Sequence, residues 1–192
     1  MKINYRPEID GLRAIAVVSV IFYHAQITFK NYQFFKGGYI GVDIFFVISG
    51  YLSTTIILKE LFFTNKFSFR LFYEKRIRRI LPVLLLILLI SIPFAFIYLI
   101  PSRLIDYSKS TLSTLGFASN IYFYFTGQEY GAESSLLKPL LHTWSLAVEE
   151  QYYLMFPIFL LLTWRFGKNR VFWMIVVLSL ISLLVSEWGW RN

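Results

Sequence analysis

The apolar runs of this chain, each close to twenty residues long, constrain its fold more than any other feature. Five stand out, with approximate bounds 10–29, 40–58, 77–100, 144–164 and 170–188. About twenty apolar residues cross the hydrocarbon core of a bilayer as one helix. Only 16% of the residues are charged, where soluble domains average about 25%. We therefore predict an all-α, polytopic transmembrane helix bundle with no separate soluble domain.

The basic residues indicate how this bundle is oriented. The loop between the second and third predicted spans holds seven of them: Lys59, Lys66, Arg70, Lys75, Arg76, Arg78 and Arg79. An excess of Lys and Arg marks the cytoplasmic side, and Lys2, Arg6 and Arg13 place the N-terminus there too. The net charge of +8 therefore reflects the basic residues that set the topology and contact membrane lipid, and we predict no nucleic-acid partner. The chain has no cysteine, and we predict no metal site.

Segment 107–126 is apolar but its first half is interrupted by Ser, Thr, Lys and Gly. The basic connector 165–170 is also expected on the cytoplasmic side. Residue 77 and this connector would then lie on the same side of the membrane, so the chain between them must cross an even number of times. The third and fourth strong spans already supply two crossings. We therefore predict that 107–126 is a re-entrant or surface-lying element on the outer side.

The first span carries Arg13 and one of only two histidines, His24. Eleven residues at 100° each end about 20° beyond three full turns, so both side chains share a face, about 16 Å apart along the axis. In one interpretation Arg13 snorkels and His24 bonds to a neighbouring helix. In the other, both mark a substrate or proton path, because ionisable groups inside spans are costly and usually functional.

Arg76 and Arg79 lie one helical turn apart at the start of the third span. They are either topology signals or a clamp for a pyrophosphate or sugar phosphate, because arginine binds phosphate with two parallel hydrogen bonds.

A third cluster lies in "LLHTWSLAVEEQYY", residues 140–153. His142, Ser145 and Glu149 fall on one helical stripe. His142 and Glu149 could pair to stabilise the helix, or Glu149 could orient a histidine of another helix. Trp144 and Glu150 of the same segment belong, with His142 and Ser145, to the residues expected to be structural or to face the substrate.

A fourth cluster lies in "GGYIGVDIFFVISGYL", residues 37–52. Its glycines allow close helix approach or a tight turn. Asp43 either caps the outer hairpin or fixes the tautomer of His24.

These four segments together, "DGLRAIAVVSVIFYH", "GGYIGVDIFFVISGYL", "FYEKRIRRILP" and "LLHTWSLAVEEQYYL", closely resemble the membrane acyltransferase-3 family. Its members are bacterial inner-membrane O-acyltransferases of the kind that acetylate lipopolysaccharide O-antigen and peptidoglycan. The resemblance runs from about residue 6 to about residue 165. It implies that residues 1–192 are the N-terminal part of an acyltransferase-3 membrane domain in the bacterial cytoplasmic membrane.

The resemblance also implies roles for single residues. The family's Arg and His motif of the first helix falls on Arg13 and His24, and its Arg-x-x-Arg motif falls on Arg76 and Arg79. Members take acetyl-CoA or another acyl-CoA from the cytoplasm as donor, and the acceptor is typically a glycan of the cell envelope. They have more membrane helices than this chain, and this branch often carries an SGNH-type domain. These parts are therefore expected partners.

On this basis we expect His24 to be the general base or a transient acyl carrier, assisted by Asp43 and Glu149, while the three arginines bind acyl-CoA. Two rival functions remain. One is a polytopic transporter of a lipid- or CoA-linked substrate, with His24 and Glu149 as a proton path. The other is a scaffold subunit without catalysis.

Overall fold

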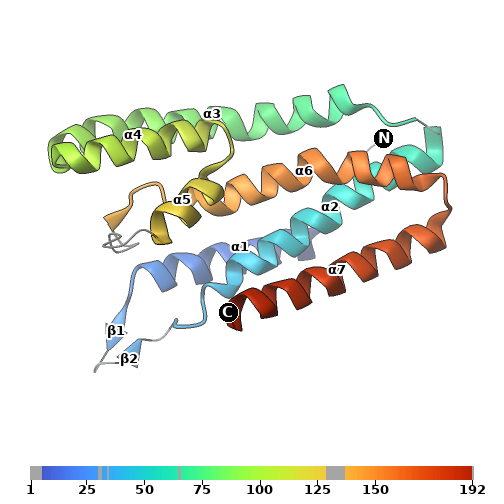
Figure 1. The fold of residues 1–192 in the computed structure, drawn as a ribbon, viewed down its shortest axis with the longest axis horizontal. Coiled ribbons are helices and arrows are strands. Elements are labelled where there is room, and N and C mark those ends of the chain that lie inside the picture. Colours follow the sequence, from blue (N-terminus) through green and yellow to red (C-terminus); the bar gives the residue numbers. More distant parts are fainter. Residues whose placement is uncertain (1–5, 30–31, 34, 65, 129–136, 192) are drawn as a thin grey trace. The chain divides into compact units, whose positions relative to one another are not determined.

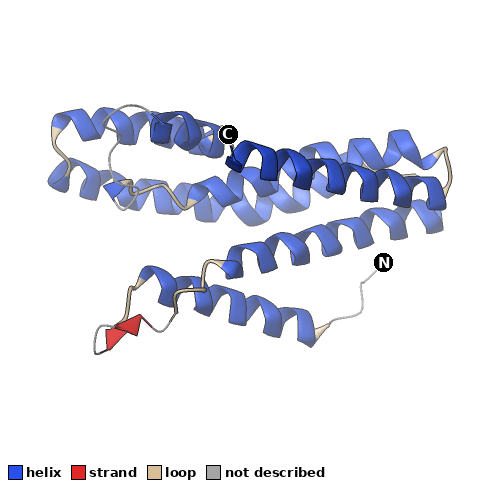
Figure 2. Cartoon of the chain, turned by 60° about the horizontal axis from the view of Figure 1, so that its bottom comes forward, coloured by secondary structure: helices blue, strands red, loops and turns tan. Residues whose placement is uncertain are grey.

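The computed structural model describes residues 6–29, 32–33, 35–64, 66–128 and 137–191. Within these ranges the chain forms seven α-helices and one two-stranded antiparallel hairpin (Figure 2). In chain order the elements are α1 (Pro7–His24), β1 (Thr28–Phe29), β2 (Tyr32–Gln33), α2 (Ile40–Thr64), α3 (Phe69–Tyr98), α4 (Pro101–Leu115), α5 (Ser119–Gln128), α6 (Thr143–Trp164) and α7 (Lys168–Arg191). The predicted all-α fold is confirmed.

Four helices of the described chain are long and apolar enough to cross a membrane: α2, α3, α6 and, over Lys168–Gly189, α7. The protein is therefore a multi-pass membrane protein. Four of the five predicted spans correspond to these helices. The fifth corresponds to α1, which is only 18 residues long and includes Glu8, Asp10 and Arg13. Each of the other four helices contains a stretch of 18 residues with at most two charged side chains.

The first helix also ends earlier than its apolar run suggests. It was predicted to continue to residue 29, but its last residue is His24. Gln26 then adopts a left-handed backbone conformation, with φ of 48°, and the chain enters the hairpin, where Thr28 pairs with Gln33. After His24, the backbone N–H and C=O groups find their hydrogen-bond partners in the turn and the hairpin, where a continued helix would have supplied them. His24 is therefore the last residue of a helix, and the predicted end of the first span at residue 29 is wrong.

Segment 107–126 is divided between two helices, α4 and α5. They are separated by a turn at Gly116–Ala118, in which Phe117 has a positive φ of 50°. Neither helix is among the four that could cross a membrane. The placement of this segment on the outer side stays a prediction.

A buried apolar cluster holds α4 and α5 against α3. Its members are Leu84, Leu88, Ala95, Tyr107, Phe123 and Leu140. The α3 and α4 helices lie side by side (Figure 1), and a hydrogen bond of 2.7 Å joins the Ser91 and Tyr107 hydroxyls between them. Tyr122 of α5 donates a hydrogen bond to the Asp106 carboxylate of α4.

The chain divides into two compact units, residues 1–150 and 151–192. The first contains α1 to α5 and the beginning of α6, where the predicted site residues lie. The second contains the rest of α6 and α7, which are connected by a turn at Arg165–Gly167. Gly167 has a φ of +86°, a conformation that glycine adopts without steric cost.

Candidate functional site

The site is built on a close antiparallel pair of helices, α1 and α2. A Cβ atom added to Gly41 would lie 2.4 Å from the Ala16 carbonyl oxygen, and one added to Gly38 would lie 2.2 Å from the Ser19 carbonyl oxygen. Only glycine permits backbones to approach this closely. The close helix approach predicted from the glycines is therefore present.

At that end, the two histidines of the chain meet. The ring centroids of His24 and His142 are 4.2 Å apart, and the rings are inclined by 66°. The Tyr23 ring also packs edge-on against His24, with centroids 5.1 Å apart. The sequence placed His24 and His142 in separate clusters 118 positions apart, and only the fold brings them into contact.

The environment of His142 favours its neutral form. Desolvation, followed by repulsion from His24, lowers the pKa of His142 below its ordinary value. His142 comes directly before the first residue of α6 and lies outside the membrane-spanning helices. It is therefore neutral at neutral pH, with one ring nitrogen able to accept a proton or a hydrogen bond.

Arg13 lies on α1, about 16 Å along the helix axis from His24. Its guanidinium is 3.9 Å from the Asp10 carboxylate. Its Nε is buried and has no hydrogen-bond partner among the described residues. A buried donor without an acceptor costs about 1–3 kcal/mol, so this atom could accommodate an oxygen of an anionic ligand.

The two adjacent carboxylates of α6 point to different helices. Glu149 accepts a hydrogen bond from the Ser49 hydroxyl of α2, and Ser49 is buried. Glu150 interacts electrostatically with Arg76 of α3. Residues 149 and 150 therefore connect α6 to both neighbouring helices. The predicted role of Glu149 beside a histidine stays a prediction, and its bond to Ser49 was not foreseen.

The arginines of α3 differ in their surroundings. The Arg76 guanidinium lies over the Phe72 ring, 4.7 Å from its centroid, and is partly buried. Arg79 is exposed and has no hydrogen bond or ion pair with another described residue. Arg78, between them in position on the helix, forms a surface ion pair of 2.7 Å with Glu74. Arg79 is thus open to an external ligand, while Arg76 is positioned by protein contacts.

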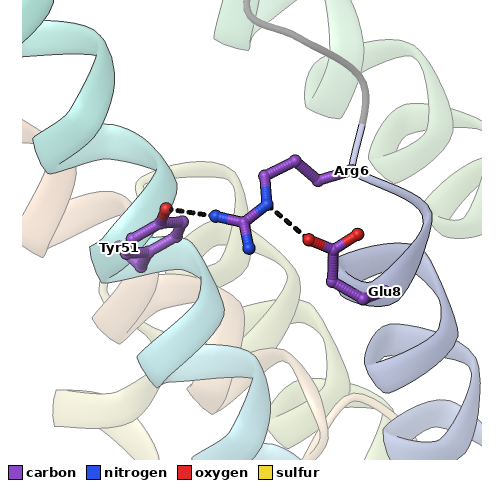
Figure 3. Close-up of polar contacts among 3 residues, drawn as sticks. All are labelled: Arg6, Glu8 and Tyr51. Carbon is purple, nitrogen blue, oxygen red and sulfur yellow. Dashed lines mark hydrogen bonds and ion pairs between the residues drawn. The ribbon is translucent and has the colours of Figure 1, made fainter.

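Arg6, at the start of the chain, was predicted only as a topology signal. Arg6 donates hydrogen bonds to the Glu8 carboxylate at 2.5 Å and to the Tyr51 hydroxyl at 2.9 Å (Figure 3). Figure 3 shows its guanidinium between these two side chains. The contact joins the beginning of α1 to the middle of α2 over 45 residues of sequence. No local pattern could have indicated it.

The remaining predicted residues are Ser145 and Trp144 of α6 and Asp43 of α2. Ser145 donates a hydrogen bond of 3.2 Å to the His142 carbonyl, which is a local helix-start contact. Trp144 packs edge-on against Phe46 of α2, with centroids 6.2 Å apart. Asp43 lies in the first turn of α2 and is exposed, and it has no hydrogen bond to His24 in the described structure. Its role at the tautomer of His24 stays a prediction.

Comparison with known proteins identifies the family. The profile of the acyltransferase-3 family, described as an acyltransferase domain, matches residues 6–192. The chain belongs to the acyltransferase-3 family. The match includes α7, so it extends beyond residue 165, where the resemblance seen in the motifs ended.

Two relatives show how much of a whole protein this chain represents. The O-acetyltransferase OatA of Staphylococcus aureus is 36% identical over 181 residues, which cover 94% of this chain and 29% of that protein. The peptidoglycan O-acetyltransferase OatA of Listeria monocytogenes is 37% identical over 185 residues, which cover 96% of this chain and 29% of that protein. The chain thus spans less than a third of these relatives. No solved structure matches it.

Proposed function

We propose that this acyltransferase-3 protein transfers an acetyl group from cytoplasmic acetyl-CoA to a hydroxyl group of a cell-envelope glycan, with the reaction centred on His24. The observation that carries the proposal is the contact between His24 and His142, at 4.2 Å between ring centroids. A pair of imidazoles in contact can take up and release a proton near neutral pH. The relatives are named O-acetyltransferases, and this name supports both the reaction and the acyl group.

In the proposed reaction, His24 removes the proton of the acceptor hydroxyl as its oxygen attacks the thioester carbonyl. The new bond is the ester C–O bond, and the bond that breaks is the C–S bond to coenzyme A. The proton taken by His24 then passes to the thiolate that leaves. His142, neutral at neutral pH, holds the His24 ring and can accept a hydrogen bond from it. A general base of this kind contributes about 10²–10⁴-fold to the rate.

The donor is proposed to bind through the arginines. The phosphates of coenzyme A lie at the opposite end of its flexible arm from the thioester, so they must bind at a distance from His24. Arg13, about 16 Å away along α1, offers a buried Nε without a partner among the described residues. Arg79 offers an exposed guanidinium. Arg76, which lies over the Phe72 ring and interacts with Glu150, is assigned to the same donor site.

The acceptor and the location follow from the relatives and from the charge pattern. The Listeria monocytogenes relative is named a peptidoglycan O-acetyltransferase, so we propose peptidoglycan as the glycan. With a cytoplasmic N-terminus in the bacterial cytoplasmic membrane, Arg13 is near the donor side and His24 is toward the acceptor side. The names of the relatives favour acetyl transfer over the transporter and the scaffold.

The test is acetyl transfer in membrane vesicles that contain the whole protein encoded by the gene. Radiolabelled acetyl-CoA is supplied on the cytoplasmic side, and label in the glycan fraction is counted. We expect His24→Ala to reduce transfer by about 10²–10⁴-fold. Ile21→Ala is the matched control, because Ile21 is one turn earlier on α1 and exposed.

Equal transfer by wild type and His24→Ala, with both proteins inserted in the membrane, would refute the proposed role of His24. Transfer by neither wild type nor variants, with label unchanged in acetyl-CoA, would instead favour the transporter or the scaffold.

A further inference from the structure

The turn between α6 and α7 borders an open groove that plays no part in the proposed reaction. Its apolar part has a volume of about 750 Å³ and is lined by residues of both helices and the turn, among them Phe159, Phe166, Trp173 and Val177. The α6 and α7 helices run away from this turn in Figure 1. The groove lies entirely within residues 151–192.

A smaller polar hollow continues the groove at the turn. Its volume is about 450 Å³, and its lining includes Gly167, Lys168 and Asn169. Phe166 and Arg170 line both the polar hollow and the apolar part. The two hollows therefore form one amphipathic groove, basic at the turn and apolar along the helices.

The register of α7 explains the shape of the apolar part. Arg170, Trp173, Val177 and Leu178 recur at intervals of three, four and one residues, so they form one stripe of the helix. From Arg170 to Leu178 this stripe is about 12 Å long. Trp173, Val177 and Leu178 are each at least half exposed, so the stripe is open to an occupant.

The charge of the groove identifies the kind of occupant. The turn carries Arg165, Lys168 and Arg170, and no acidic residue occurs between it and Glu187. Arginine and lysine at the membrane surface attract the phosphates of anionic lipids, and tryptophan favours the level of the headgroups. A free phosphate would match the basic end but would leave the apolar stripe empty.

We propose that this groove binds one anionic phospholipid of the surrounding leaflet. Its phosphate lies between the Lys168 ammonium and the Arg170 guanidinium, and one acyl chain lies along the stripe from Trp173 to Leu178. The site is separate from the residues assigned to acetyl transfer and would bind lipid whether or not the protein is turning over.

The test measures lipid retained by the whole protein. The purified protein is stripped of lipid in detergent and titrated with phosphatidylglycerol or phosphatidylcholine, and native mass spectrometry counts bound lipids. We expect one phosphatidylglycerol to bind more tightly than the others and more tightly than phosphatidylcholine. Arg170→Gln should weaken this binding about fivefold, the change that corresponds to about 1 kcal/mol per basic residue near the membrane surface.

Two further variants make the result specific. Arg165→Gln removes the same charge from the same turn, but Arg165 lies over the Phe166 ring at 4.9 Å and does not line the groove. It should retain the lipid. Val177→Trp fills the apolar stripe at an exposed position and should reduce binding although all basic residues remain.

Equal loss in Arg165→Gln and Arg170→Gln would overturn the site, because the charge of the turn alone would then attract the lipid. Equal binding of both lipids, or unchanged binding in Val177→Trp, would also overturn it. Competition by inorganic phosphate at the concentration of the lipid would assign the basic end to free phosphate instead. Retention of no lipid by wild type would also overturn the proposal.

Discussion

Replacing Gly41 by alanine should disturb the site without touching any residue assigned to the chemistry. Gly41 lies where α2 crosses α1, and it is buried. An added Cβ would lie 2.4 Å from the Ala16 carbonyl oxygen and 2.7 Å from Cγ2 of Val20. The valine can change rotamer, but the carbonyl belongs to the α1 backbone. Alanine can be accommodated only if the two helices move apart.

The size of that movement follows from the contact distance. An ordinary contact of a Cβ begins at 3.4 Å, so α1 must retreat by about 1 Å at Ala16. Overpacking of this kind costs about 1–3 kcal/mol. The displacement is carried along a continuous helix to His24, eight residues further on. A misplacement of about 1 Å in a reacting group can reduce turnover about 10²-fold.

The assay combines stability and turnover. Unfolding in detergent is followed by the fluorescence of the five tryptophans, and acetyl transfer in vesicles is normalised to folded protein. Gly37→Ala is the matched control, because a Cβ there would have its nearest contact at 4.0 Å. We expect Gly41→Ala to melt earlier and to lose about 10²-fold in normalised transfer, while Gly37→Ala resembles wild type.

Two results would refute this reasoning. If Gly41→Ala melts and turns over like Gly37→Ala, the close approach of α1 and α2 does not hold the site together. If Gly41→Ala melts earlier but keeps full normalised transfer, the packing stabilises the fold but the position of α1 does not set the position of the reacting group.

Three further predictions test single side chains. Arg79→Gln should raise the KM for acetyl-CoA about 10–100-fold, the loss expected for a hydrogen bond to a charged group. Arg78→Gln should leave the KM unchanged. Equal KM values in the two variants would make both arginines topology signals. Because the pKa of His142 is lowered, the folded state disfavours its protonation. The contribution of His142 to stability is therefore fully present above about pH 6.5 and is lost as the pH falls below this value, through the lowered pKa of the folded state. The melting difference between wild type and His142→Gln should therefore be constant at higher pH and change only below it, and parallel melting curves from pH 5 to 8 would contradict this. Ser49→Ala removes the donor to a carboxylate of α6 and should lower the free energy of unfolding by about 1–3 kcal/mol. Ser53→Ala should lower it less, because the Ser53 hydroxyl bonds within α2 at 2.7 Å. Equal losses in the two variants would show that the bond to α6 contributes nothing.

The sequence predicted the residue types of the candidate site better than their partners. Arg13 and His24 share a helix, so their common face follows from periodicity alone. The partner of His24 could not be predicted in this way, because His142 is on another element. The same holds for Glu149: its helical stripe suggested His142, but a hydroxyl of α2 is its hydrogen-bond donor. Contacts within one helix are local, whereas contacts between helices depend on how the helices cross.

The sequence by itself determined the class of this protein. Apolar runs of about twenty residues must be helical in a bilayer, because only helices satisfy their own backbone hydrogen bonds there. Four motifs in order also indicated the family. Only the structure showed that α1 ends at His24, because the hairpin that follows Gln26 competes with continued helix inside one apolar run. The tertiary structure alone decided which side chains of different helices meet. The approach of α1 to α2 at Gly38 and Gly41 depends on the surfaces of both helices, and a pattern within one helix does not contain it.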